Sequence, residues 1–147
     1  MTSAPGPSVI FSTPLTMERP QCLTTLALSS RTPTKSLPFY EACLAPLGIR
    51  KTQDQPQWRA AVFMIPGTGS FLWIGAGAAD QPQQRLTGYF HLAFSASDEA
   101  AVRAFYDAAL SAGGTENGKP GLRRPGYFAA FVLDPDGNNI EAAWRSL

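Results

Sequence analysis

One pattern occurs twice along this chain of 147 residues. Residues 25–44 align with residues 91–110 without a gap, at an offset of 66, and seven of the twenty positions are identical. Near the ends of the two copies, residues 63–65 match residues 131–133 at an offset of 68. Self-similarity of this kind is the sequence signature of a repeated structural unit. We therefore predict a fold in which one module is used twice.

Each copy has the pattern of a strand, a helix and three further strands. Residues 23–30 and 90–97 alternate larger apolar residues with small or polar ones, which is typical of a half-buried strand. In the second copy Ser97 is the expected helix cap, and Pro38 predicts a late start for the helix of the first copy. An apolar stripe at helical spacing follows Ser97, formed by Val102, Phe105, Tyr106, Ala109 and Leu110. The shorter strands are predicted at 49–53, 58–65 and 70–76, and at 115–117, 127–133 and 139–144.

These patterns divide the chain into four segments. Residues 1–20 contain four prolines and no periodicity, and are expected to form an N-terminal arm. The first module is predicted over 21–80, a linker over 81–87 and the second module over 88–147. The sequence DPDG at 134–137 has the residues of a tight turn and predicts a hairpin between the last two strands.

Composition argues against several classes of protein. Twelve Lys and Arg balance eleven Asp and Glu without a block of like charge, which argues against a nucleic-acid partner. No apolar run approaches the roughly 20 residues of a membrane-spanning helix, so no membrane partner is expected. Cys22 and Cys43 form neither a zinc motif nor a disulfide framework, which favours a cytoplasmic protein. The chain has a single histidine, so one chain cannot supply a site with several histidines.

Three segments carry a resemblance to a known family: FYEACLAPLG at 39–48, HLAF at 91–94 and FVLDPDGNNIEA at 131–142. With the duplicated βαβββ pattern, they resemble the vicinal oxygen chelate superfamily, which includes glyoxalase I, bleomycin-resistance proteins, extradiol dioxygenases and epoxide-opening thiol transferases. The resemblance implies an α+β fold in which the two modules form an open, eight-stranded mixed barrel with a concave substrate cleft. It also implies a homodimer, the common assembly in that superfamily.

The resemblance further implies up to four metal ligands, on the first and last strands of each module. In the second module these positions hold His91 and Glu141. The repeat offsets place Thr25 and Trp73 at the equivalent positions of the first module, or Leu72 if the register slips by one residue. The set of two His and one carboxylate expected for an extradiol dioxygenase is therefore incomplete. Either no cofactor is required, or a divalent metal ion is held weakly by His91 and Glu141.

Two mechanisms are open for the retained pair. In the first, Glu141 orients His91 and raises its proton affinity, so that the imidazole acts as a general acid and base. This suits an isomerase, a lyase or a ring-forming tailoring step on a small, hydrophobic, oxygenated substrate, in biosynthesis or detoxification. In the second, the pair binds a divalent cation that acts as a Lewis acid. The alternatives are a non-catalytic protein that sequesters a small molecule, and a metal-dependent lyase or dioxygenase with an incomplete ligand set.

Other residues are weaker candidates for contacts with the substrate. Trp58, Trp73 and Tyr127 are predicted to line the cavity and stack on the substrate, with ordinary core packing as the alternative for each. Arg124, beside Arg123 in a glycine- and proline-flanked loop, is a predicted clamp for a carboxylate or carbonyl group. Thr25 is included because of its position in the repeat.

Overall fold

The computed structural model describes residues 25–76 and 90–146 and shows the same series of elements twice. The first module contains β1 (Thr25–Ser29), α1 (Pro33–Leu44), β2 (Arg50–Gln55), β3 (Ala60–Met64) and β4 (Phe71–Gly75), with short 3-10 turns at Ala45–Leu47 and Pro56–Trp58. The second contains β5 (His91–Ser95), α2 (Glu99–Ser111), β6 (Thr115–Arg124), β7 (Tyr127–Leu133) and β8 (Asn139–Arg145). The predicted arm (1–20) and linker (81–87) lie outside the described residues.

Each module forms one four-stranded mixed sheet. The strand order is β1-β4-β3-β2 in the first and β5-β8-β7-β6 in the second, with the first and last strands of each module parallel. Strand pairing among the described residues stays within each sheet, so the eight strands leave the barrel open. The predicted α+β architecture of two βαβββ modules is confirmed.

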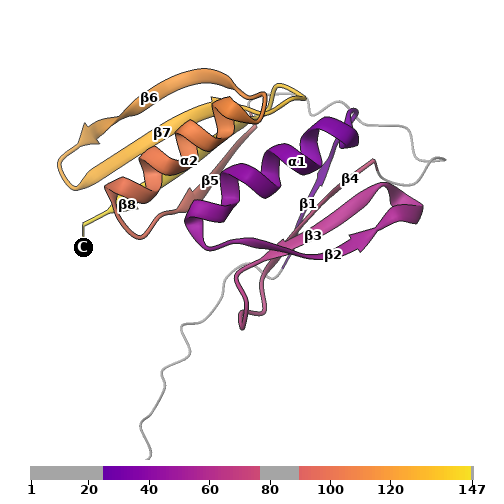
Figure 1. Ribbon diagram of the computed structural model, residues 1–147. Helices are drawn as coiled ribbons and strands as arrows, with labels where there is room; N and C mark the ends of the chain where they lie inside the picture. The colour runs from indigo at the N-terminus through magenta and orange to yellow at the C-terminus, as the bar shows by residue number, and fades with distance from the viewer. Residues whose placement is uncertain (1–24, 77–89, 147) are drawn as a thin grey trace, which may run out of the picture.

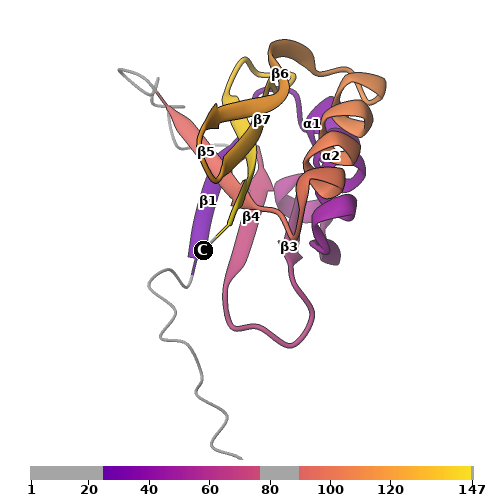
Figure 2. The same cartoon turned by 90° about the vertical axis from the view of Figure 1, so that its left-hand side faces the viewer.

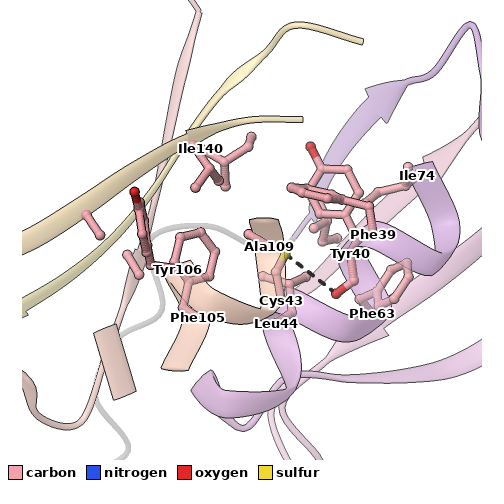
Figure 3. Packing of buried hydrophobic residues seen from close by; sticks show 14 of the residues in the cluster. Phe39, Tyr40, Cys43, Leu44, Phe63, Ile74, Phe105, Tyr106, Ala109 and Ile140 are labelled. Atoms are coloured by element: carbon pink, nitrogen blue, oxygen red, sulfur yellow. Dashed lines mark hydrogen bonds between the residues drawn. The ribbon is translucent and has the colours of Figure 1, made fainter. Parts of the chain in front are cut away.

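The two helices lie on the same side of the sheets, and α1 packs against α2 (Figures 1 and 2). The apolar strand residues that face the helices are buried or partly buried, in keeping with the period-2 alternation of the strands. Figure 3 shows that the helices contribute equivalent aromatic residues to this core: Phe39 and Phe105, and Tyr40 and Tyr106. A single core therefore joins the modules. Neither described helix, of 12 and 13 residues, is long and apolar enough to cross a membrane.

Three local predictions were wrong. Helix α1 begins at Pro33 and contains Pro38 in its interior, where the proline removes one helical hydrogen bond. Helix α2 is capped by Asp98, whose Oδ1 accepts from Ala101 N at 2.7 Å, and not by Ser97. Strand β6 extends to Arg124 instead of ending at Asn117; its pairing with β7 shifts register three times.

The DPDG turn at 134–137 joins β7 to β8 as predicted, and it also binds the first module. Asp136 accepts hydrogen bonds from the hydroxyls of Ser30 (2.5 Å), Ser36 (3.0 Å) and Thr32 (3.2 Å) at the start of α1. Arg31 N also donates to the Asp136 carboxylate, at 3.2 Å. The β7–β8 hairpin of the second module is thus hydrogen-bonded to the start of α1 in the first.

Asp136→Asn is expected to make the stability of the protein less sensitive to acid. Burial raises the pKa of Asp136, but the hydrogen bonds from Ser30, Ser36 and Thr32 outweigh it, so the pKa lies below its usual value. A depressed folded-state pKa stabilises the protein above the unfolded-state pKa of about 3.9, and this contribution is lost as pH falls through the folded-state pKa.

Because Asp136 is only half-buried, solvent screening limits the effect to about 1 kcal/mol at pH 7. Urea unfolding at pH 7 and pH 2.5 measures it. Asp136→Asn should be less stable than the native chain at pH 7, and the gap should close at pH 2.5. The control is Asp107→Asn, which removes an exposed carboxylate from α2. A gap that is the same at both pH values would contradict the prediction.

Candidate functional site

His91 and Glu141 lie on neighbouring parallel strands of the second sheet. β5 pairs with β8 so that Ala93 lies opposite Glu141, and His91 precedes Ala93 by two residues on the same face. His91 Nε2 is 2.5 Å from Glu141 Oε2. Glu141 is only 2% exposed, whereas the His91 side chain is 29% exposed. The two side chains form a hydrogen-bonded pair in which the carboxylate is buried and the imidazole reaches the surface.

This pair occupies the face of the second sheet that points away from the helices. The residues that alternate with it, Leu92 on β5 and Ile140 and Ala142 on β8, pack into or against the helix-facing core. In the view of Figure 2, the helices lie to the right of the strands and this face is on the opposite side. The alternation of each strand therefore separates the polar pair from the apolar core.

Tyr127 forms the second hydrogen bond to the Glu141 carboxylate. Its hydroxyl donates to Glu141 Oε1 at 2.5 Å. The positions between them on this face, Ala129 on β7 and Ala143 on β8, hold small, buried residues that leave room for the ring. Burial raises the pKa of Tyr127 and the bond to Glu141 acts in the same direction, while Arg145 opposes them. The phenol is therefore protonated and a hydrogen-bond donor at neutral pH.

Arginine and aromatic side chains surround this group. Guanidinium carbons of Arg124 and Arg145, on the strands either side of β7, each lie 5.0 Å from the centre of the Tyr127 ring. Arg123 lies 5.1 Å from the centre of the Phe131 ring, whose own centre is 5.8 Å from that of His91. These contacts extend the polar group into a continuous row of side chains.

A two-residue turn brings Arg124 beside Tyr127. Pro125 and Gly126 join β6 to β7, and Arg124 pairs directly with Tyr127 in the ladder. Gly126 has a φ of 71°, a conformation that favours glycine, and proline before it fixes the preceding φ. The loop predicted to carry a substrate clamp is therefore a tight hairpin that ends at the site.

The arrangement is suited to proton transfer. A neutral imidazole that donates Nε2–H to a carboxylate has its lone pair on Nδ1. When Nδ1 accepts a proton, the resulting imidazolium remains bonded to the Glu141 carboxylate. Tyr127 holds the other oxygen of Glu141 and so restricts rotation of that carboxylate. The group can take up and release a proton while its geometry is preserved.

The register of the sheets identifies the equivalent positions of the first module. Thr25 pairs with Phe71 as His91 pairs with Asn139, so Thr25 corresponds to His91. By the same ladder Trp73 corresponds to Glu141, and the alternative, Leu72, is a buried residue of the core.

These positions do not fit a tightly held metal ion. Thr25 offers only a hydroxyl, and an indole is not a usual ligand; Trp73 Nε1 donates instead to Gln55 Oε1 at 2.8 Å. Within residues 25–76 and 90–146, no group of three or more His, Cys, Asp or Glu side chains is arranged to hold a metal ion. His91 and Glu141 remain as two ligands, fewer than the three protein ligands of a typical catalytic zinc site.

The predicted substrate contacts are divided between the two sheets. Tyr127 is bonded to Glu141, and Arg124 lies over the Tyr127 ring. Trp73 and Thr25 belong to the first sheet, and no hydrogen bond or ring contact joins them to His91 or Glu141 in the described structure. Trp58 lies in a 3-10 turn after β2 and is 46% exposed.

Phe131 and Arg145 belong to this row of side chains and were not predicted from the sequence. Phe131 lies directly opposite Glu141 in the β7–β8 ladder, and Arg145 lies opposite Tyr127. Both follow from the hairpin register once the DPDG turn is assigned, because cross-strand partners share a face. The spacing of residues on either side of that turn could therefore have identified both as neighbours of the site.

Comparison with protein families gives one match that covers most of the chain. The model described as Glyoxalase: Glyoxalase/Bleomycin resistance protein/Dioxygenase superfamily matches residues 23–142. None of the curated protein sequences matches the chain significantly.

Solved structures with the same fold include three bacterial proteins. A glyoxalase/bleomycin resistance protein from Albidiferax ferrireducens T118 has 25% identity and a TM-score of 0.69, over 86% of this chain and 100% of its own. A glyoxalase-related enzyme from Fulvimarina pelagi has 21% identity and a TM-score of 0.62, over 84% and 87% of the two chains. Lactoylglutathione lyase from Agrobacterium tumefaciens has 19% identity and a TM-score of 0.57, over 85% and 95%.

Proposed function

Because the chain belongs to the Glyoxalase/Bleomycin resistance protein/Dioxygenase superfamily, we propose that it is an enzyme that moves a proton on a small, oxygenated, largely apolar substrate. His91 is the catalytic acid and base, and Glu141 is the residue that positions it. The observation that supports this most is the single carboxylate that binds the His91 ring through one oxygen and the Tyr127 hydroxyl through the other. The homodimer remains a prediction.

The proposed reaction begins at a carbon next to a carbonyl group. His91 Nδ1 takes the proton, the C–H electron pair forms an enolate, and the imidazolium remains bonded to Glu141. If the substrate is an α-hydroxy carbonyl compound, return of that proton to the former carbonyl carbon, with transfer of the hydroxyl proton to the former carbonyl oxygen, completes an isomerisation. Its transfer to a leaving oxygen, as the enolate electrons expel that oxygen, completes an elimination and would make the enzyme a lyase. In both outcomes His91 takes up one carbon-bound proton and releases it again, and neither outcome needs an oxidant or a reductant.

The proposal predicts enzyme-dependent exchange of carbon-bound protons. In D₂O at neutral pH, the protein should exchange the protons next to the ketone of an aryl keto acid such as 4-oxo-4-phenylbutanoate, which proton NMR follows directly. Exchange should be unaffected by EDTA, since the residues at the site do not suit a tightly held metal ion. The panel also includes the methyl ester of this acid and a neutral aryl ketone.

The alternatives give different results in the same experiment. A sequestering protein would bind one or more of these probes without accelerating exchange of any of them. Loss of exchange in EDTA, with recovery on adding a divalent cation, would indicate the metal-dependent alternative. Either outcome would overturn the proposed acid–base role.

A further inference from the structure

Three arginines gather at one end of the face that carries His91 and Glu141. Arg124 and Arg145 flank the Tyr127 ring from neighbouring strands, and Arg123 lies over Phe131. Arg123 and Arg124 belong to β6 and Arg145 to β8, the strands on either side of β7 in the second sheet (Figure 1). The Tyr127 side chain contacts both guanidiniums through its ring and, through its hydroxyl, the carboxylate that His91 contacts.

The positive charge of this cluster is not balanced by carboxylates in the described part of the chain. The ion pairs found there involve Lys51, Arg103 and His91, and none of the three arginines forms one. The nearby Glu141 carboxylate is already bonded through both oxygens. Positive charges at this end of the sheet repel each other, and an oxyanion bound to the two guanidiniums would reduce that repulsion.

The three arginines differ in how they are held. Arg123 Nη2 donates to the backbone oxygens of Lys119 and Ala129, at 2.5 and 3.3 Å. Part of its hydrogen-bonding capacity is therefore already used within the β6–β7 hairpin. Arg124 and Arg145 make no such backbone bonds in the described structure, and both residues are exposed. These two guanidiniums are therefore the better candidates for a ligand. A guanidinium matches the planar oxygens of a carboxylate or a phosphate.

We propose that Arg124 and Arg145 bind an oxyanion of the substrate, a carboxylate or a phosphate monoester. The apolar part of the substrate then lies along Tyr127 and Phe131, and its acidic carbon reaches His91. This assignment rests on the proposed function for the position of the reacting carbon, but the binding of the anion does not require turnover. The proposed substrate is therefore an organic acid with a carbonyl group and an apolar part, which is either aromatic or aliphatic.

Binding of matched probes tests the assignment. Calorimetry or NMR titration would give dissociation constants for 4-oxo-4-phenylbutanoate, its methyl ester and phenyl phosphate. We expect the native protein to bind the carboxylate at least about tenfold more tightly than the ester, and this preference to weaken at high salt. In the double variant Arg124→Gln/Arg145→Gln the preference should disappear. Comparison of the two anionic probes identifies which oxyanion the site prefers.

Arg103→Gln is the matched control. Arg103 lies 4.7 Å from the centre of the Phe128 ring, on the helix-facing side of the same sheet, so this variant removes a similar contact away from the site. It should retain the full preference for the anion. Equal affinities for acid and ester in the native protein, or the same loss in Arg103→Gln, would overturn the assignment.

The two proposals fail in distinguishable ways. If the acid binds tightly but no probe exchanges its protons, the anion site stands and the acid–base role does not. If the acid and its ester bind and exchange equally well, the acid–base role stands and the anion site does not. As a further check, His91→Gln should still bind the acid more tightly than the ester, because that variant leaves both arginines in place.

Discussion

His91→Gln is expected to slow proton exchange by at least about 100-fold, since a positioned general base contributes about 10²–10⁴-fold. Glutamine cannot accept the proton, but its amide can still donate a hydrogen bond to Glu141. The bond between Tyr127 and Glu141 is therefore retained, and the shape of the site changes little. Rates of exchange measured by NMR at equal protein concentration test this.

Two measurements separate loss of catalysis from loss of structure in that variant. The midpoint of thermal unfolding should stay within a few degrees of that of the native protein, because the His91 side chain is partly exposed. The affinity for 4-oxo-4-phenylbutanoate should change by less than about threefold. Native rates of exchange in a folded, ligand-binding His91→Gln protein would rule out the acid–base role.

Asp134→Ala is expected to cause the largest loss of stability among polar substitutions, about 3–5 kcal/mol. The buried Asp134 carboxylate accepts hydrogen bonds from the Tyr40 hydroxyl (2.7 Å), from Asn138 N and Nδ2 (2.8 and 2.9 Å) and from Asp136 N (2.9 Å). Burial, together with the Asp134 charge, raises the pKa of Tyr40 above its usual range, so the phenol is always a donor. Alanine would leave this fully buried hydroxyl without its acceptor.

Tyr40→Phe provides the matched comparison, because it removes one of these bonds and keeps the turn. It should cost about 1.5–3 kcal/mol, the range for a hydrogen bond to a charged group. Urea unfolding of both single variants and of the double variant measures the coupling between the two side chains. Additive effects would show that the bond contributes little. The milder Tyr40→Phe variant keeps the test informative even if Asp134→Ala does not fold.

Repetition made the fold predictable from sequence alone. The offsets of 66 and 68 between the copies are also the offsets between equivalent residues of the two sheets, from Thr25 to His91 and from Phe71 to Asn139. Strand alternation also accounts for the position of His91 and Glu141 on the face opposite the helices, because side-chain direction has a strict period of two. These features depend on local spacing, which a single sequence contains.

Features that depend on distant contacts were not predictable in this way. Strand β6 continues through Pro120 because it is an edge strand with irregular pairing, a place where a missing N–H is tolerated. Pro38 is accommodated within α1, whose other residues are fixed by the shared core. Arg145 has no local pattern of its own, and its place beside Tyr127 arises only from the β7–β8 pairing.

The attachment of the DPDG turn to the start of α1 bears on how the chain is made. Ser36 is hydrogen-bonded to Asp136, exactly 100 residues later, and Tyr40 to Asp134, 94 residues later. On the ribosome, the first helix emerges long before its partners have been translated. The polar start and apolar stripe of this helix therefore stay incompletely covered, and open to misfolding, until the DPDG turn has been translated.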